Sequence, residues 1–421
     1  MPSQSINLYN QLAKNKLFKK TINFNLERIK LVLNKLNHPE RKLNNVINII
    51  GSSGKYSTLT ALKYFIEANK QSVSAYISPS LKDIRERFWM GSSFLSYKDI
   101  KKTIKIIEKQ KIPLTIFEVL TVIFILNASK RNNDFNLIEA GALFAKDSTN
   151  VFHFPLLQLI VNINKQHLNF VKRKTLNEII YQKVGFLSQY TKIYIGKQTK
   201  SNLKKIKNYL KKNKSEKIYQ DKWHLLKIKK SYFYKDKNLK IKLNTKNIKS
   251  IGLLENLCMA IKVALDLKIN KKIIQKTIPR IFFEGRVMNL SKGKIKKKLF
   301  NKENIILDGA HAEVDAKNLA SYLKTIKGPK YGIWGMTKNK EPSLFIKKFK
   351  GTFKKIITVP VDKEKNSMPA KILYDIAKKN KFETDIAKNV NQAIKKISNR
   401  NKKTIVIFGS LYLVGNVLRS N

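Results

Sequence analysis

The stretch IIGSSGKYST contains the residue types of a phosphate-binding loop. Its glycines, Gly51 and Gly54, allow a tight turn that directs backbone N–H groups toward an anion. Lys55 is long enough to reach phosphate oxygens, and a hydroxyl from Ser57 or Thr58 can bind Mg²⁺ where a helix begins. The pattern therefore predicts a site for the phosphates of a nucleotide.

Two details of this loop differ from the common phosphate loop. The spacing is shorter than in G-x-x-x-x-G-K-[ST], and Tyr56 separates Lys55 from the first hydroxyl residue. On the pattern alone, an ordinary Gly- and Ser-rich turn between a strand and a helix stays an alternative.

The elements predicted around the loop supply the context that it needs. Residues 46–50 are a short apolar run typical of a buried parallel strand, and residues 72–77 are a second strand. Between them, residues 57–70 carry apolar side chains at helical spacing. Strand, loop, helix and strand in this order form the unit in which phosphate loops occur.

The rest of the chain is predicted to alternate between strands and helices. Apolar helices are predicted over residues 25–36, 114–129 and 250–267, hairpins and short helices over 191–248, and a Lys-rich hairpin over 291–298. Strands are predicted over residues 135–141, 156–163, 304–311, 330–336, 354–361 and 403–410. This alternation predicts the α/β class, in two domains, residues 1–288 and a smaller one at 289–421, with ligands at the carboxyl ends of parallel strands.

The composition bounds the possible partners. The 421 residues include 86 Lys and Arg against 28 Asp and Glu, a formal net charge of +58. Such a charge suits a nucleic acid or an anionic membrane. The lysines are spread along the whole chain, together with abundant Asn and Ile, as AT-rich codons would produce. We therefore favour a solvated basic surface, and read the densest stretch, residues 197–214, as a helix face or a tail-like insertion.

Other classes of protein are disfavoured by what the sequence lacks. It contains no run of about 18 uncharged apolar residues, and its first residues have no apolar core of a signal peptide. A single cysteine, Cys258, excludes internal disulfides and a multi-cysteine metal site. We expect a cytoplasmic protein without a membrane partner.

Further motifs along the chain resemble the dihydrofolate synthase/folylpolyglutamate synthase family of the Mur ligase superfamily. The loop has the short spacing of that family's G-T-N-G-K-G-S-T. The other motifs follow in the family's order and span nearly the whole chain: YISPSLKDIRERF, LTIFEVLT, EAGALFAKDSTN, INKQHLNFV, YQKVGF, FEGRV, LDGAHAE, WGMTKNKE and GSLYLVG.

The resemblance implies a fold and an activity. The fold would be Mur ligase-like, with a P-loop-type parallel-sheet ATPase domain that carries a folate-binding loop and a smaller Rossmann-like domain. The activity would be an ATP- and Mg²⁺-dependent amide ligase. Such an enzyme phosphorylates a carboxylate of dihydropteroate or a folate, and the amine of L-glutamate then attacks the acyl phosphate. The resemblance further implies a monomer with small-molecule substrates, and the even spread of the lysines argues against a nucleic-acid partner.

The resemblance also implies residue roles. Catalysis would involve Lys55, Lys183 and His311, where Lys183 matches the lysine that is carbamylated in this superfamily. The nucleotide would be bound by Gly51, Gly54, Lys55, Ser57, Thr58, Asn256, Arg286 and Asp308. Magnesium would be bound by Ser57, Glu118 and His167. The pterin site would be bordered by Ser78, Pro79 and Asp147, and the incoming glutamate by His311 and Ser410.

Several of these residues have an ordinary structural alternative. Glu118 could be a surface carboxylate at a helix end, and His167 could be a hydrogen-bonded loop histidine. Ser410 could cap a helix, which is compatible with either interpretation.

The chain also departs from the family pattern. The replacements are Ser52-Ser53 for Thr-Asn, Tyr56 for Gly, Ser80 for His, Ala145 for Arg, Gln166 for Asp, Gly252-Leu253 for His-Gln, Ala312 for Asn and Asn339 for Asp. Losing one such group usually costs about 1–4 kcal/mol of transition-state stabilisation. Two alternatives therefore stay open beside the ligase: a catalytically impaired homologue with a binding role, and a basic nucleic-acid-binding α/β protein.

Overall fold

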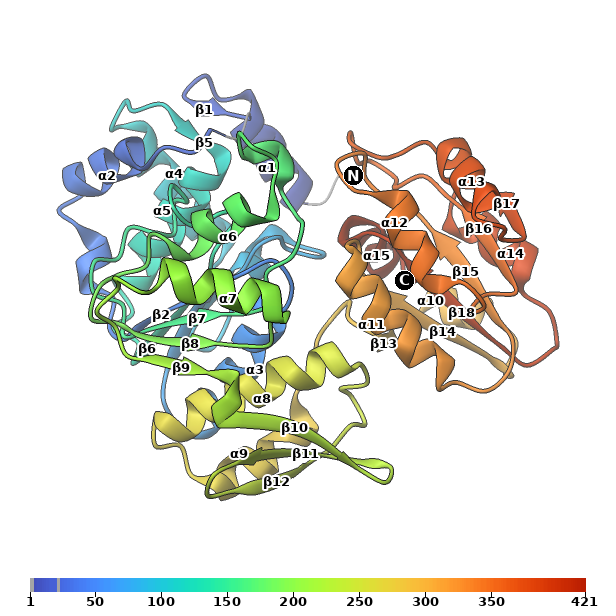
Figure 1. Ribbon diagram of the computed structural model, residues 1–421. Coiled ribbons are helices and arrows are strands. Elements are labelled where there is room, and N and C mark those ends of the chain that lie inside the picture. Colours follow the sequence, from blue (N-terminus) through green and yellow to red (C-terminus); the bar gives the residue numbers. More distant parts are fainter. Residues whose placement is uncertain (1–3, 21–22) are drawn as a thin grey trace. The chain divides into compact units, whose positions relative to one another are not determined.

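The structure is a computed structural model that describes residues 4–20 and 23–421, and Figure 1 labels its elements. The chain forms two compact units. The N-terminal unit consists of Met1–Asn244 and Glu255–Ile281, and the C-terminal unit consists of Thr245–Leu254 and Phe282–Asn421. Each unit contains its own sheet, so each is described by itself.

The N-terminal unit is built on a seven-stranded sheet in the order β4-β3-β6-β2-β7-β8-β9. Its strands are β2 (Val46–Ile50), β3 (Val73–Tyr76), β4 (Phe88–Met90), β6 (Phe135–Glu139), β7 (Leu157–Ile160), β8 (Lys192–Ile195) and β9 (Lys217–Tyr219). All neighbours are parallel except β3 and β4. Every residue of β2, β3, β6 and β7 is buried, as expected of a parallel sheet covered on both faces.

Helices surround this sheet, and the predicted ones are confirmed. They are α1 (Gln4–Lys14), α2 (Leu26–Lys35), α3 (Lys55–Ala68), α4 (Tyr97–Glu108), α5 (Ile116–Ala128), α6 (Leu176–Val184) and α7 (Lys200–Tyr209). A two-stranded sheet pairs β1 (Phe18–Lys19) with β5 (Leu114–Thr115). The lysine-rich helix α7 buries Asn202 and Ile206, so the dense lysine stretch is largely a helix face with solvated lysines.

The middle of the chain adds an antiparallel sheet and two helices to the N-terminal unit (Figure 1). The strands are β10 (Trp223–Ile228), β11 (Ser231–Asp236) and β12 (Lys240–Leu243), and the helices are α8 (Ile251–Asp266) and α9 (Lys271–Thr277). The predicted hairpins therefore lie at residues 223–243, whereas the segment KIYIG extends the parallel sheet as β8.

The C-terminal unit has a six-stranded sheet in the order β13-β14-β18-β15-β16-β17. Its strands are β13 (Met288–Asn289), β14 (Glu303–Asp308), β15 (Lys330–Trp334), β16 (Lys355–Thr358), β17 (Thr384–Ile386) and β18 (Lys403–Phe408). Its main helices are α11 (Glu313–Lys324), α12 (Pro342–Ile346), α13 (Ala370–Lys379), α14 (Val390–Ile397) and α15 (Leu411–Ser420). Only β13 pairs antiparallel, so the predicted parallel α/β alternation is confirmed.

The hairpin predicted over residues 291–298 is wrong. The segment forms a short helix, α10 (Lys294–Lys297), which begins after Gly293 at a φ of +106°. The side chain of Asn421 accepts the N–H of Ile295 at 2.9 Å and so satisfies one donor at the helix start. Gly293 therefore starts a helix and does not form the centre of a hairpin turn.

Helix α11 begins without a side-chain cap, because its N-cap residue is Ala312. Asn at an N-cap accepts a backbone N–H, and replacing such a residue by Ala usually costs about 0.5–2 kcal/mol. We expect Ala312→Asn to raise the free energy of unfolding of the C-terminal unit by about 1 kcal/mol, measured by urea denaturation. Ala312→Val, which brings no acceptor, should give no gain. Equal stability of the Asn and Val variants would contradict this account.

Candidate functional site

The loop from Gly51 to Gly54 joins β2 to α3 and requires glycine at both ends. Gly51 has a φ of +148° and Gly54 a φ of +103°. A Cβ atom on Gly51 would lie 2.4 Å from Val161 Cγ2, and one on Gly54 would lie 2.6 Å from Asn256 Oδ1. The backbone therefore turns in a conformation that side chains rarely adopt, in close contact with two other segments.

The two lysines predicted to act in catalysis converge on this loop. Lys55 Nζ donates to the carbonyl oxygens of Gly51 at 3.2 Å and Ser52 at 3.4 Å. Lys183 Nζ, from α6, donates to the same Gly51 oxygen at 2.9 Å and to Ala142 O at 2.6 Å. Burial, together with the charge of Lys55, lowers the pKa of Lys183 well below its ordinary value.

Ser57 and Asn256 also meet at the loop. Asn256 Nδ2 donates to Ser57 Oγ at 2.8 Å, and Ser57 Oγ lies 3.1 Å from Gly54 O, to which it donates. Thr58 is fully buried, and its Oγ1 has no hydrogen-bond partner within the described chain. Of the two hydroxyl residues at the helix start, Ser57 is thus the one positioned by Asn256, which is itself a predicted nucleotide-binding residue.

Glu139 is a residue of this site that the sequence prediction missed. It ends β6, opposite Ile49 of β2, so parallel pairing brings it to the edge where the loop begins. Its Oε1 lies 3.9 Å from Lys55 Nζ, and its Oε2 accepts the N–H of Ser78 at 3.1 Å. The sequence feature that could have identified Glu139 is a carboxylate near the end of a predicted buried strand.

Glu118 lies at the start of α5 in a different setting. It forms a capping box with Thr115, whose N–H it accepts at 2.6 Å. Its other oxygen, Oε1, accepts from Arg28 Nη2 at 2.9 Å. The carboxylate thus caps a helix and pairs with an arginine, and the predicted metal role of Glu118 stays a prediction.

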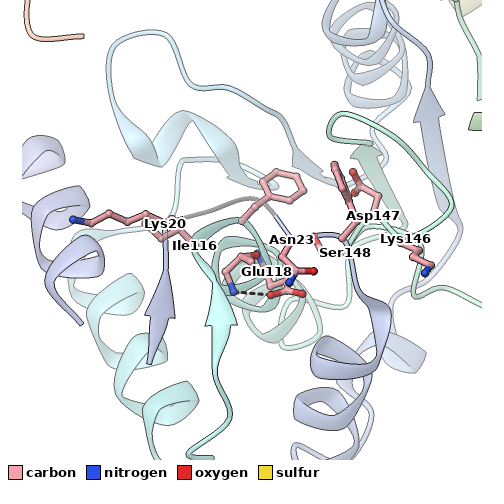
Figure 2. Close-up of a pocket in the computed structure, with 10 residues that line it drawn as sticks. Lys20, Asn23, Ile116, Glu118, Lys146, Asp147 and Ser148 are labelled. Carbon is pink, nitrogen blue, oxygen red and sulfur yellow. Dashed lines mark hydrogen bonds between the residues drawn. The ribbon is translucent and has the colours of Figure 1, made fainter. Parts of the chain in front are cut away.

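A pocket in the N-terminal unit contains Glu118 together with Asp147 (Figure 2). It is lined by Lys20, Asn23, Phe24, Thr115, Ile116, Phe117, Glu118, Lys146, Asp147 and Ser148. Asp147 is buried, and its Oδ1 accepts from the N–H and hydroxyl of Thr149 at 3.0 and 2.7 Å. Burial raises the pKa of Asp147 above its ordinary value. The pocket therefore combines aromatic rings with cations and carboxylates, which suits a flat polar ring system.

His167 lies in the segment that follows β7. It has a φ of +63°, and its ring stacks on Phe170 with centroids 5.8 Å apart. Phe170 in turn meets the edge of Phe24, which lines the pocket of Figure 2. The preceding residue, Gln166, bonds to Ser53 of the loop.

The loop offers oxygen donors that suit Mg²⁺. Mg²⁺ binds one or two carboxylates and keeps water and phosphate oxygens as its other ligands. The hydroxyl of Ser57 and the carboxylate of Glu139 provide that chemistry beside the loop. Groups of three or more His, Cys, Asp or Glu able to hold a metal do not occur among residues 4–20 and 23–421. These donors therefore fit a magnesium ion completed by phosphates and water better than a site made of protein ligands alone.

In the C-terminal unit, the predicted residues gather at one edge of the sheet. Asp308 ends β14, and its oxygens accept the N–H groups of Val287 at 2.7 Å and Ala310 at 2.6 Å. The guanidinium of Arg286 lies next to this strand end, since a Cβ atom added to Gly309 would be 3.0 Å from Arg286 Nη1. Burial raises the pKa of Asp308 to about 6, although the charge of Arg286 opposes this rise.

His311 and Ser410 complete that edge. His311 Nδ1 hydrogen-bonds to Gly309 O at 2.9 Å. Asp308 pairs with Phe408 of the parallel strand β18, so Ser410 follows at the same end of the sheet. Ser410 Oγ accepts the N–H of Tyr412 at 3.1 Å and so caps α15. This is the helix cap that the sequence predicted as an alternative for Ser410.

The raised pKa of Asp308 predicts a pH dependence of stability. The folded state binds this proton up to about pH 6, whereas the ordinary value is 3.8. The stabilising contribution of the protonated carboxyl is therefore complete below pH 4 and is lost as the pH rises through 6. From pH 4 to pH 7, wild type should lose about 2 kcal/mol relative to Asp308→Asn in urea unfolding. Asp362→Asn is the control, and a difference that stays constant with pH would contradict this expectation.

The chain is similar to known proteins over most of its length. Residues 291–420 match a family model described as "Dihydrofolate synthetase, C-terminal domain". The dihydrofolate synthase/folylpolyglutamate synthase of Buchnera aphidicola subsp. Schizaphis graminum (strain Sg) is 27% identical over 411 residues. That alignment covers 94% of this chain and 92% of the relative.

Solved structures share the fold over nearly the whole chain. The folylpolyglutamate synthase of Thermotoga maritima has a TM-score of 0.79 at 24% identity, covering 98% of this chain and 96% of its own. The bifunctional folylpolyglutamate synthase/dihydrofolate synthase of Yersinia pestis, complexed with AMPPNP and a Mn ion, has a TM-score of 0.85 at 19% identity, covering 99% and 98%. At these identities the likeness concerns the fold, and it confirms the predicted fold class.

Proposed function

We propose that the chain is an ATP- and Mg²⁺-dependent ligase of the dihydrofolate synthase/folylpolyglutamate synthase family. Its residues 291–420 match the C-terminal domain model of dihydrofolate synthetase, and one such enzyme is 27% identical over 411 residues. The proposed ligase adds L-glutamate to dihydropteroate, to a folate, or to both, through an acyl phosphate. The observation that carries this proposal is the loop at the end of β2, where Lys55 and Lys183 both bond Gly51 O beside the carboxylate of Glu139.

The proposed role of the loop residues is to position and neutralise phosphate groups. In such a reaction the substrate carboxylate attacks the terminal phosphate of ATP, and catalysis consists mainly of positioning and charge stabilisation. Lys55 carries a positive charge on the loop, and Asn256 fixes the hydroxyl of Ser57. Ser57 and Glu139 would hold Mg²⁺, which supplies further neutralisation of phosphate charge when bound.

The other predicted residues are assigned to the two organic substrates. We propose that the pocket containing Asp147 takes the pterin ring, bordered by Ser78 and Pro79. His311 and Ser410 would lie near the incoming glutamate, whose amine displaces phosphate from the acyl phosphate. Asp308 and Arg286 would contact the nucleotide from the C-terminal unit.

The test of this function is release of ADP that depends on the pteroate or folate. Purified protein is incubated with ATP, Mg²⁺ and L-glutamate, with and without dihydropteroate or tetrahydrofolate. The ligase should release ADP only with the acceptor present, together with a glutamylated product. A wild-type protein that binds ATP and the acceptor but forms no product would instead be the impaired homologue.

Three finer proposals concern the state of the protein. Within the described residues, none of the helices combines the length and apolar character needed to cross a bilayer. We propose a cytoplasmic monomer with domains at residues 1–288 and 289–421. We also propose that its basic surface is solvated and has no nucleic-acid partner. Salt-sensitive binding of RNA or DNA near physiological ionic strength would contradict the proposal that the protein has no nucleic-acid partner.

A further inference from the structure

The phosphate loop uses two of its own backbone donors within the fold. The N–H groups of Ser52 and Ser53 both donate to the carbonyl oxygen of Asn162, at 2.8 and 3.1 Å. A phosphate loop normally directs such N–H groups toward the anion. These two amides are already engaged, so the first half of this loop must offer an anion some other donor.

The side chain of Ser53 is arranged to be that donor. Its Oγ accepts Asn164 Nδ2 at 3.0 Å and Gln166 Nε2 at 3.1 Å. A hydroxyl has two acceptor positions and one hydrogen, and these two amides fill both acceptor positions. The hydrogen of Ser53 must therefore point to a third partner, and the structure records no acceptor for it within the described chain.

A relay of amides fixes the orientation of Asn164. Asn162 Nδ2 donates to the carbonyl oxygen of Lys197 at 3.1 Å, and a carbonyl can only accept. The Oδ1 atom of Asn162 is thereby turned toward Asn164, whose Nδ2 donates to it at 3.1 Å. The same NH₂ group of Asn164 donates to Ser53 Oγ. The carbonyl oxygen of Lys197, which can only accept, thus fixes the orientation of Asn162 and, through it, that of Asn164.

We propose that Ser53 is a phosphate-binding residue whose hydroxyl hydrogen is aimed at the nucleotide by Asn164 and Gln166. This inference rests on the proposed function. It gives a physical meaning to two departures from the family pattern, Ser53 for Asn and Gln166 for Asp. A carboxylate at position 166 could only accept from Ser53 and would turn the hydrogen away from the phosphate. The two replacements are thus complementary, and Gln166 and Asn164 are positioning residues.

The charges around Ser53 agree with an anionic partner. Ser53 is half-buried and lies between Gly51 and Gly54 in a loop whose Gly51 oxygen accepts a hydrogen bond from the ammonium group of Lys55. A hydroxyl donating to a phosphate oxygen makes a charge-assisted hydrogen bond, which is stronger than a neutral one. Losing it should weaken nucleotide binding by about tenfold or more.

The experiment compares nucleotide affinity in matched variants. Dissociation constants for ADP and ATP with Mg²⁺ are measured by calorimetry for wild type, Ser53→Ala, Ser53→Thr and Gln166→Glu. We expect about tenfold weaker binding for Ser53→Ala and for Gln166→Glu, and rescue to within about threefold for Ser53→Thr, which keeps the hydroxyl. Lys165→Gln, an exposed neighbour, makes the same charge change as Gln166→Glu and should bind within about twofold of wild type.

A second readout separates this role from a structural one. Thermal unfolding of wild type and Ser53→Ala is measured without and with ADP. In Ser53→Ala, ADP should stabilise the protein less than it does in wild type, whereas the stability without ADP should not fall equally. Unchanged affinity of Ser53→Ala, or an equal loss of stability without ADP, would overturn the proposal. Normal affinity of Gln166→Glu would overturn the positioning role. Wild type that does not bind ATP would refute the proposed function instead, so the two failures are distinguishable.

Discussion

Glu139→Gln is expected to lower the rate of ATP-dependent ligation by about 10³-fold and to raise the Mg²⁺ concentration needed for half-maximal rate. The carboxylate lies 3.9 Å from Lys55 Nζ, at the end of the strand next to the loop. Gln has nearly the same shape and can still accept the N–H of Ser78, but it lacks the charge that Mg²⁺ requires. Losing a group that neutralises phosphate charge costs several kcal/mol of transition-state stabilisation. Steady-state kinetics over a Mg²⁺ titration measure both effects.

Glu118→Gln is the matched control for this prediction. Glu118 is also buried, but its oxygens bond Thr115 N and Arg28 beside the pocket of Asp147. We expect Glu118→Gln to change the KM for the pteroate more than the Mg²⁺ requirement. An unchanged Mg²⁺ requirement in Glu139→Gln, with a raised one in Glu118→Gln, would contradict our assignment. It would support the metal role that the family resemblance implies for Glu118.

The strands and helices near the site could be predicted because their local patterns are strong. The runs that became β2 and β18 are mostly apolar, and every residue of both strands is buried, as expected of a parallel sheet covered on both faces. The helices α3 and α5 follow from apolar spacing, and the T-x-x-E pattern at Thr115 marks the start of α5. Local signals of this kind depend only on residues close in sequence.

The neighbours of each element could not be predicted in the same way. Glu139 belongs to the site because β6 pairs with β2, although the 84 residues 51–134, which include α3, β3 and α5, separate the end of β2 from the start of β6. The segment Thr245–Leu254 belongs to the C-terminal unit, although α8, which begins within it at Ile251, continues into the N-terminal unit. Both facts depend on tertiary contacts that no local pattern records.

The same limit explains why departures from the family pattern are hard to weigh in sequence. Read singly, Ser53 and Gln166 each replace a group of the family and suggest a weakened loop. In the structure they bond each other, so their effects are coupled. Ala312 has no such partner, since it leaves the N-cap of α11 without an acceptor. Replacements must therefore be judged in pairs that are close in space.

Lys183→Ala is expected to lower the ligation rate by about 10²–10³-fold, and acetate or formate should partly restore it. Lys183 is buried, and burial with the charge of Lys55 lowers its pKa well below the ordinary value. A lowered pKa favours the uncharged amine, which is the form that adds CO₂ to give a carbamate and a proton. The resemblance implies this carbamylation, and a carbamate would place a carboxylate-like group beside the loop.

The rescue experiment distinguishes the carbamate from the unmodified amine. In Lys183→Ala, a small carboxylate can enter the space that the side chain leaves and supply the missing negative charge. Ethylamine would instead supply an ammonium group that donates to Gly51 O and Ala142 O, as Lys183 Nζ does in the structure. Sodium chloride at equal ionic strength controls for salt. Rescue by ethylamine but not by acetate would show that Lys183 acts as an amine that holds the loop, and the carbamate would then have no role in this chain.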